Sequence, residues 1–354
     1  MDQLYTKLQK RLDKYSFGFP PAPGGIDIEL LKKFFTEEEA ELFLKMSPKL
    51  ETPDEVSVRT GIDSGELCVK LEEMASRGLL FRQQKDGIKK YGAIPFMHGL
   101  VEFHIKRVDR PMAELIDEFF ETVYNENIAK NADLFLRTVP VNKSVKVEHH
   151  VAAFDDAAEI LKNAGLIAVA ECFCRKKASL THGSCGKPLE TCFMFGSMAQ
   201  YYIDNSIGRR VEIEEALQIL SDAQDKGLVT QPSASQNPAG MCSCCGDCCG
   251  ILGAVKKFPR PAEMVLSNHM AVIDKSSCMG CEVCIDRCQM EAVAIGSDGT
   301  AEINYDRCIG CGLCVIKYPS GAITLQEKPG EKKRDVPENT KEQMFLMAKK
   351  RGLF

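Results

Sequence analysis

Apolar residues recur every three or four positions through the first third of the chain, which predicts a helical N-terminal region over residues 1–130. Leu4, Leu8 and Leu12 form the first such stripe. Residues 96–130 continue the helical spacing, and nothing in this stretch indicates a particular chemistry. We therefore predict that the region is a scaffold.

Within this region, residues 36–95 are predicted to form three helices followed by two strands. Thr36 and Thr52 stand where helices would be capped, and Asp63 precedes the third helix. The sequence Lys85-Asp-Gly87 marks the turn between the strands. This order of elements resembles a winged helix-turn-helix domain, and the resemblance implies DNA binding as one possible role.

The charge of the third predicted helix argues against DNA as a partner. Acidic residues in it outnumber its basic residues, Lys70 and Arg77, whereas contact with phosphates needs a basic face. Cys68 lies in the same helix and is predicted to be a small buried residue. The only basic feature is the wing, with Arg82, Lys85, Lys89 and Lys90. We predict a docking or scaffold role, and DNA binding is the less favoured alternative.

Residues 140–260 hold nine cysteines and are predicted to form an α/β cysteine-rich metal-binding domain. A helix over 156–164 and a buried strand over 166–170 lead to the first of these cysteines, and a helix over 193–204 follows the fourth. The nine candidate ligands are Cys172, Cys174, Cys185, Cys192, Cys242, Cys244, Cys245, Cys248 and Cys249.

Nine thiols are more than one zinc ion needs, so we predict one or two iron–sulfur clusters here, with zinc or redox-active thiols as alternatives. The doubled Cys-Cys-Gly sequence at 244–246 and 248–250 resembles the cysteine-rich motif of heterodisulfide reductase-type subunits, although that family has its two motifs far apart. The resemblance implies unusual clusters. Arg175 and Lys187 lie among the cysteines, where their charge would favour a reduced cluster or would simply be solvated on the surface.

Two Cys-x-x-Cys-x-x-Cys runs dominate the C-terminal part of the chain, and zinc sites prefer separate Cys-x-x-Cys pairs instead. Between the runs, residues 292–295 and 300–303 flank a Gly-Ser-Asp-Gly turn and predict a β-hairpin. Residues 270–325 therefore resemble a bacterial-type ferredoxin domain with two [4Fe-4S] clusters. The cysteines that carry the resemblance are Cys278, Cys281, Cys284, Cys288, Cys308, Cys311 and Cys314.

The resemblance implies ligand sets that cross between the two runs. One cluster takes the complete set of Cys288, Cys308, Cys311 and Cys314. The other takes Cys278, Cys281, Cys284 and the residue before Pro319, which is Tyr318 in this chain. A phenol with a pKa near 10 is a poor ligand for reduced iron. We therefore expect a three-cysteine [3Fe-4S] or [4Fe-4S] cluster, while ligation by Tyr318 oxygen or water, or no cluster at all, stays open.

Composition indicates the class of partner and the compartment. The chain has 354 residues, 17 cysteines and a net charge of −5, which gives no general bias toward polyanions. The N-terminus is polar and no apolar run is long enough to span a bilayer, so we predict a cytoplasmic protein without membrane insertion. Reduced cysteines that hold metal fit this compartment and suggest an anaerobic or low-oxygen host.

The predicted architecture is α+β and multidomain. A winged-helix-like α domain is followed by the α/β cysteine-rich domain, by a ferredoxin-like dicluster domain over 265–328, and by a charged linker and terminal helix over 329–354. Met344, Phe345 and Met347 are expected to pack that helix against the protein. The order of motifs resembles uncharacterised 4Fe-4S binding proteins of anaerobic bacteria, and this resemblance implies no known activity.

No Gly-rich dinucleotide loop or P-loop is present, so we expect hydride or substrate chemistry to lie on another subunit and assign no catalytic residue. The predicted function is electron transfer: the clusters pass single electrons to or from a partner, a flavoprotein or another oxidoreductase. Two alternatives stay open. One is a catalytic subunit with an open iron site and heterodisulfide reductase-like thiol chemistry; the other is a redox-sensing winged-helix regulator.

Overall fold

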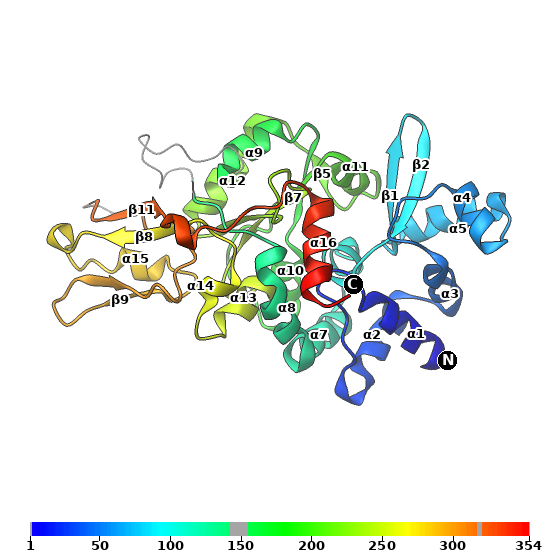
Figure 1. Ribbon diagram of the computed structural model, residues 1–354, viewed down its shortest axis with the longest axis horizontal. Coiled ribbons are helices and arrows are strands. Elements are labelled where there is room, and N and C mark those ends of the chain that lie inside the picture. Colours follow the sequence, from blue (N-terminus) through cyan, green and yellow to red (C-terminus); the bar gives the residue numbers. More distant parts are fainter. Residues whose placement is uncertain (1, 142–154, 317–320, 354) are drawn as a thin grey trace.

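The computed structural model describes residues 2–141, 155–316 and 321–353 (Figure 1). The N-terminal helices lie at one end of the molecule, the five-stranded sheet lies in the middle, and the cysteine runs of the C-terminal part lie at the other end. The last helix returns to the N-terminal helices, where Arg351 donates to the carbonyl of Ser16 at 3.0 Å. None of the helices in the described ranges combines the length and the apolar character needed to cross a membrane.

The N-terminal elements appear in the predicted order. Thr36 and Thr52 both cap helices as predicted, and each forms a capping box, Thr36 with Glu39 and Thr52 with Glu55. Cys68 is exposed, so the prediction that it is buried was wrong. The elements are α1 (Asp2–Leu12), α2 (Ile26–Phe34), α3 (Glu37–Lys45), α4 (Pro53–Thr60), α5 (Ser64–Ser76) and the antiparallel pair β1 (Leu80–Lys85) and β2 (Ile88–Ala93).

The following segment is helical but irregular. Its first turn is distorted, because His98 has a positive φ of 56° and its neighbours are not helical. An aromatic cluster that includes Phe19, Phe96 and Tyr124 packs this segment against the start of the chain. The elements are η2 (Phe96–Leu100), α6 (Val101–Phe103), α7 (Arg110–Phe119), η3 (Phe120–Tyr124), α8 (Asn125–Asn131) and η4 (Ala132–Leu134).

The middle part is built on one five-stranded sheet in the order β5-β3-β4-β7-β6, and all of its neighbouring strands are antiparallel. The buried strand predicted at 166–170 is present, shifted by one residue. The helix predicted over 193–204 was wrong at its start, because residues up to Phe195 belong to a strand. The strands are β3 (Ile167–Glu171), β4 (Glu190–Phe195), β5 (Arg209–Arg210), β6 (Val229–Pro232) and β7 (Gly240–Cys244).

The two faces of this sheet have different neighbours. On one face, Val169, Phe193 and Met241 form a core with Leu161 and Leu220 from two helices. The other face points toward the N-terminal helices, and the side chains that alternate with this core lie there. The helices of this part are α9 (Ala157–Asn163), α10 (Phe173–Thr181), α11 (Gly196–Asp204), α12 (Ile213–Asp225), α13 (Gly250–Lys256) and α14 (Pro261–Met264).

The C-terminal part contains two small antiparallel pairs. The predicted hairpin is confirmed as β9 with β10, and a second pair joins β8 to β11. The elements are β8 (His269–Ile273), η7 (Lys275–Ser277), α15 (Val283–Asp286), β9 (Val293–Ile295), β10 (Ala301–Ile303), β11 (Ile323–Glu327), η8 (Gly330–Lys332) and α16 (Thr340–Lys350).

Two arginines fasten this part to the middle of the molecule. Arg287 donates to the carbonyl of Leu313 at 2.8 Å and, across the junction, to the carbonyl of Gln224 in α12 at 2.9 Å. Arg307 donates to the carbonyl of Lys256, at the end of α13, at 3.0 Å. Because each guanidinium presents several donors in a fixed geometry, it can join chain segments that are distant in sequence.

The terminal helix α16 packs on the protein as predicted, but of the three residues expected to hold it only Met347 is buried. Met347 is buried, and the buried amide of Gln343 donates to the carbonyl of Phe135 at 2.9 Å. Met344 and Phe345 keep 38% and 53% of their surface exposed. The buried stripe therefore follows the i, i+4 pair rather than the most apolar residues.

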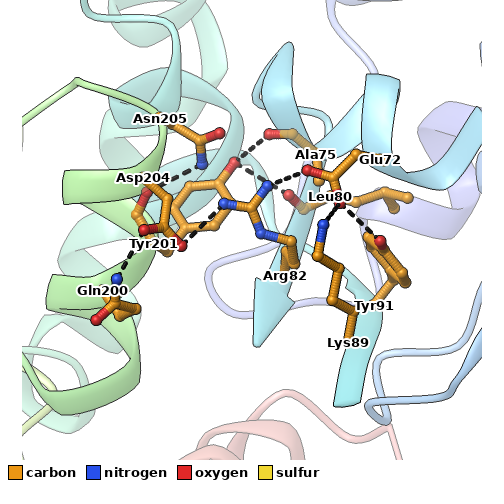
Figure 2. A network of polar contacts seen from close by, with 10 residues as sticks. All are labelled: Glu72, Ala75, Leu80, Arg82, Lys89, Tyr91, Gln200, Tyr201, Asp204 and Asn205. Atoms are coloured by element: carbon orange, nitrogen blue, oxygen red, sulfur yellow. Dashed lines mark hydrogen bonds and ion pairs between the residues drawn. The ribbon is translucent and has the colours of Figure 1, made fainter. Parts of the chain in front are cut away.

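A polar network joins the N-terminal elements to the middle part (Figure 2). The hydroxyl of Tyr201, in α11, lies 2.7 Å from the carbonyl of Ala75 and 3.1 Å from that of Leu80. Arg82, on β1, forms an ion pair with Glu72 and lies 3.1 Å from Asp204 of α11. These contacts place α5 and β1 firmly against α11.

We predict that Tyr201→Phe lowers the free energy of unfolding by about 1–2 kcal/mol, because the two buried carbonyls lose their shared donor. Urea unfolding of anaerobic protein, followed by circular dichroism, measures the change. Tyr305→Phe is the control, since Tyr305 is 52% exposed and its loss of a hydroxyl should change stability by less than about 0.5 kcal/mol. Equal stability of Tyr201→Phe and the wild type would show that the network does not stabilise the protein.

Candidate metal centres

The cysteines of the C-terminal part gather in two places. Cys288, Cys308, Cys311 and Cys314 line one small cavity, together with apolar residues from the ends of β8, β9 and β10. Burial, together with the neighbouring thiols of Cys288 and Cys308, raises the pKa of the Cys311 thiol to about 12. Metal ions deprotonate coordinating thiols outright, so four buried or half-buried thiols around one cavity fit a metal cluster.

Backbone amides support these sulfur atoms. The amide of Ala292 donates to Cys288 Sγ at 3.2 Å. Such donors stabilise negative charge on sulfur and are a usual means of tuning an iron–sulfur centre. Gly310, inside the second cysteine run, has φ of 65°, and a Cβ there would lie 2.0 Å from the carbonyl oxygen of His269. Only glycine lets this loop approach β8 so closely.

Cys278, Cys281 and Cys284, from the first cysteine run, form the second group of thiols in this part. Cys284 is buried, and burial followed by the nearby thiols of Cys281 and Cys278 raises its pKa. The amide of Ala301 donates to Cys278 Sγ at 3.3 Å, which matches the contact made to Cys288 in the other set. Tyr318, the predicted unusual fourth ligand, lies outside the described residues.

Six of the nine middle cysteines line one apolar cavity on the N-terminal face of the central sheet. Three adjacent strands and the starts of two helices deliver them, and alternation along β7 points two of them to the same side. We call these residues the six-thiol ring: Cys172, Cys174, Cys192, Cys242, Cys244 and Cys249.

The ring is closed, because each thiol is a hydrogen-bonding neighbour of the next. The order around it is Cys172, Cys192, Cys242, Cys244, Cys249, Cys174 and back to Cys172. The order of the thiols around the ring differs from their order in the sequence, because the ring passes between strands that are paired in the sheet but distant along the chain.

The thiols of the ring differ in acidity. Hydrogen bonds from Cys192 and Cys244 lower the pKa of Cys242 to about 5, despite its burial. Cys249 has its pKa raised to about 12, chiefly by its hydrogen bond with Cys174. The ring therefore shares its protons unevenly, as expected for closely packed groups that compete to ionise.

Arg175 supplies positive charge next to the ring. It is 3% exposed and donates to the carbonyl of Ser243 at 2.9 Å and to the hydroxyl of Thr191. Burial opposes its charged form, but Cys172, Cys192 and other thiols raise its pKa overall. The alternative that Arg175 is a solvated surface charge was therefore wrong, because the side chain is enclosed between α10 and the sheet.

The segment 96–130, in which the sequence indicates no particular chemistry, forms the wall of the cavity opposite the sheet. Met97, His98 and Glu102 line it, together with aromatic residues such as Tyr202. Burial raises the pKa of the Glu102 carboxyl, although its Oε2 accepts from the amide of Gly99 at 3.1 Å. No local pattern in the sequence could have assigned these residues to a cysteine site, since only tertiary packing brings them there.

The other three middle cysteines form a second group. The sulfur atoms of Cys185, Cys245 and Cys248 all lie within 4.8 Å of one another, and among the described residues they are the only such set of possible metal ligands. A hydrogen bond from Cys248 lowers the pKa of Cys245 to about 5, and the charge of Lys187 acts in the same direction. We call these residues the three-thiol group.

Comparison with known proteins gives one match. Residues 271–325 match the family model of the 4Fe-4S dicluster domain. No curated protein and no solved structure was found to match the chain. The match covers both cysteine runs and the cavity lined by Cys288 and Cys314. The C-terminal part of the chain is thus a 4Fe-4S dicluster domain, and the cofactors of this domain are [4Fe-4S] clusters.

Proposed function

We propose that the protein carries single electrons between the dicluster domain and a further iron–sulfur centre held by the six-thiol ring. Bound clusters supply the one-electron chemistry. The observation that carries this proposal is packing: Met290, Ile309 and Leu313 of the dicluster domain belong to the same buried apolar cluster as Cys244 and Cys249 of the ring. The two thiol-lined cavities are thereby linked through closely packed protein.

The residue chemistry of the ring supports iron–sulfur ligation. A zinc ion takes four ligands, so six converging thiols exceed one zinc site. Thiolates buried together also repel one another, and Arg175 offsets part of that charge. In the dicluster domain we propose the crossed ligand sets, with Cys288, Cys308, Cys311 and Cys314 on one cluster and Cys278, Cys281 and Cys284 on the other.

The N-terminal region is proposed as the cover and docking scaffold of this centre rather than as a DNA reader. Of the basic residues of the wing, Arg82 and Lys89 both pair with Glu72. Lys70 of α5 pairs with Glu38 and Glu66. Basic side chains engaged in this way offer little to phosphates. We further propose that the protein is cytoplasmic and that its redox partner is another oxidoreductase. Its domains are proposed to lie near 1–130, 140–260, 265–328 and 329–354.

Replacing two ring cysteines tests the proposal directly. In Cys192→Ala/Cys244→Ala we expect the loss of about four irons per chain for each cluster that the ring holds, while the electron paramagnetic resonance signals of the dicluster domain persist. Iron and sulfide analysis of anaerobic protein, with spectra after dithionite reduction, measures both. Cys68→Ala is the matched control, because Cys68 is an exposed thiol on α5. Unchanged iron in the double variant would exclude the ring as a centre.

Arg175 provides a test of the redox role. We expect Arg175→Gln to lower the reduction potential of the ring centre by roughly 60 mV, a tenfold change in a one-electron equilibrium, because the reduced cluster is more negative and loses a nearby cation. Redox titration followed by electron paramagnetic resonance measures the shift. Arg175→Lys keeps the charge and should move the potential much less. Equal shifts in both variants would point to packing rather than charge.

One observation favours a second function, catalysis at the ring. Glu102 places a carboxyl with a raised pKa in the same cavity, where it can hold a proton for a reaction. Reduction of a disulfide to two thiols needs two electrons, which would arrive singly, and two protons, one of which Glu102 would deliver and the other of which water would supply.

We expect a small disulfide to reoxidise the reduced protein and to perturb the spectrum of the ring centre, and Glu102→Gln to slow this reaction at least tenfold without changing reduction by dithionite. Stopped-flow absorbance under argon measures both steps. A matched control is Glu126→Gln, since Glu126 is exposed on α8. If the disulfide leaves the spectrum of the ring centre unchanged, the protein is a carrier only.

A further inference from the structure

We propose that the three-thiol group, formed by Cys185, Cys245 and Cys248, binds a single zinc ion and is a metal site separate from every iron–sulfur centre of the protein. This inference does not rest on electron transfer, and it concerns cysteines that the six-thiol ring leaves unused.

The spacing of the sulfur atoms favours one ion over a cluster. Thiolates that bind one tetrahedral zinc ion at about 2.3 Å lie about 3.8 Å apart. In an iron–sulfur cube each thiolate binds a different iron, so the sulfur atoms stand farther from one another. The three-thiol group keeps its sulfur atoms within 4.8 Å, whereas in the described ranges no three cysteines of the dicluster domain approach one another so closely. The sulfur atoms of the three-thiol group thus have the closer spacing of ligands to one ion, and those of the dicluster domain have the wider spacing of ligands to a cluster.

The group is also separate from the ring in its contacts. Cys248 is hydrogen-bonded to Cys245 and to Cys185, so the three thiols pair among themselves. The three thiols share a small apolar cluster of their own, with Ala223 and Leu228 from the end of α12 and the residue before β6. Cys244 is the last residue of β7 and Cys245 follows it, and these two neighbours in sequence belong to different sites.

Charge and hydrogen bonding suit a zinc ion with three thiolates. Such a site has a net charge of −1, and the Lys187 ammonium acts on Cys245 from the same loop as Cys185. The amide of Cys248 donates to Cys245 Sγ at 3.4 Å, which is the kind of outer contact that orients metal ligands. Cys185 and Cys248 are partly exposed, so water can complete the tetrahedron.

The position of the group indicates what the ion would do. It would join the loop before β4 to the turn after β7, and that turn touches the dicluster domain. The amide of Gly246 donates to Gln289 Oε1 at 2.9 Å, and a Cβ at Gly246 would lie 2.4 Å from the carbonyl oxygen of Gln289. Gln289 follows the ligand candidate Cys288. The zinc ion would therefore fix the surface on which the dicluster domain rests.

Metal analysis of the full chain tests the proposal. Protein produced with both iron and zinc in the medium and purified without oxygen is expected to contain about one zinc per chain, and Cys185→Ala/Cys248→Ala is expected to lose that zinc and keep its iron and sulfide. Cys68→Ala is again the control and should keep both metals. Wild-type protein without zinc, zinc retained by the double variant, or loss of iron and sulfide from it would each overturn the proposal.

A measurement on the wild type covers the case in which the variant does not fold. Zinc X-ray absorption should show about three sulfur ligands at about 2.3 Å. A shell of only nitrogen and oxygen would identify the ion as adventitious and overturn the proposal. Zinc and iron are counted separately, so a protein without a working relay would still show the zinc site, and the reverse also holds.

Discussion

The structure depends on one constraint, which is the burial of many thiols at one place without leaving them unpaired. The pairing of the strands in the five-stranded sheet brings the thiols together. Since β4 pairs with β3 and with β7, Cys192 lies among cysteines that both neighbouring strands deliver. Alternation along β4 and β7 sends the cysteines to one face and large apolar side chains to the other. Each thiol then has a thiol neighbour, and Arg175 balances part of the charge.

The dicluster domain is attached by contacts that suit a rigid junction. Arg287 and Arg307 donate to carbonyls at the ends of α12 and α13. The backbone of Gly246 lies so close to the carbonyl of Gln289 that a Cβ there would clash with it. Backbone acceptors are fixed in place, so these bonds hold the two parts in one relative position. A fixed junction keeps the distance between the two thiol-lined cavities constant.

The N-terminal region contributes contacts and one cavity wall to the middle part of the molecule. Tyr201 and Arg82 hold α5 and β1 against α11, and the distorted turn at His98 forms one wall of the ring cavity. The order of elements that the sequence shares with a winged helix thus lies beside a cavity lined by cysteines of the same chain.

The sequence by itself determined the local features. Cysteine spacing identified the dicluster domain, and hydrophobic period and capping residues predicted the N-terminal helices and the hairpin, because these depend on neighbours within a few positions. Tertiary structure decided the rest. The division of nine cysteines into six and three, the buried position of Arg175 and the place of Glu102 all depend on strand pairing and on packing between distant segments, which leave no local signal. β4 and β7 went unpredicted for a related reason: the apolar run Phe193-Met-Phe195 of β4 does not alternate and continues into the helical pattern of α11, and β7 has only Met241 between its cysteines and glycine.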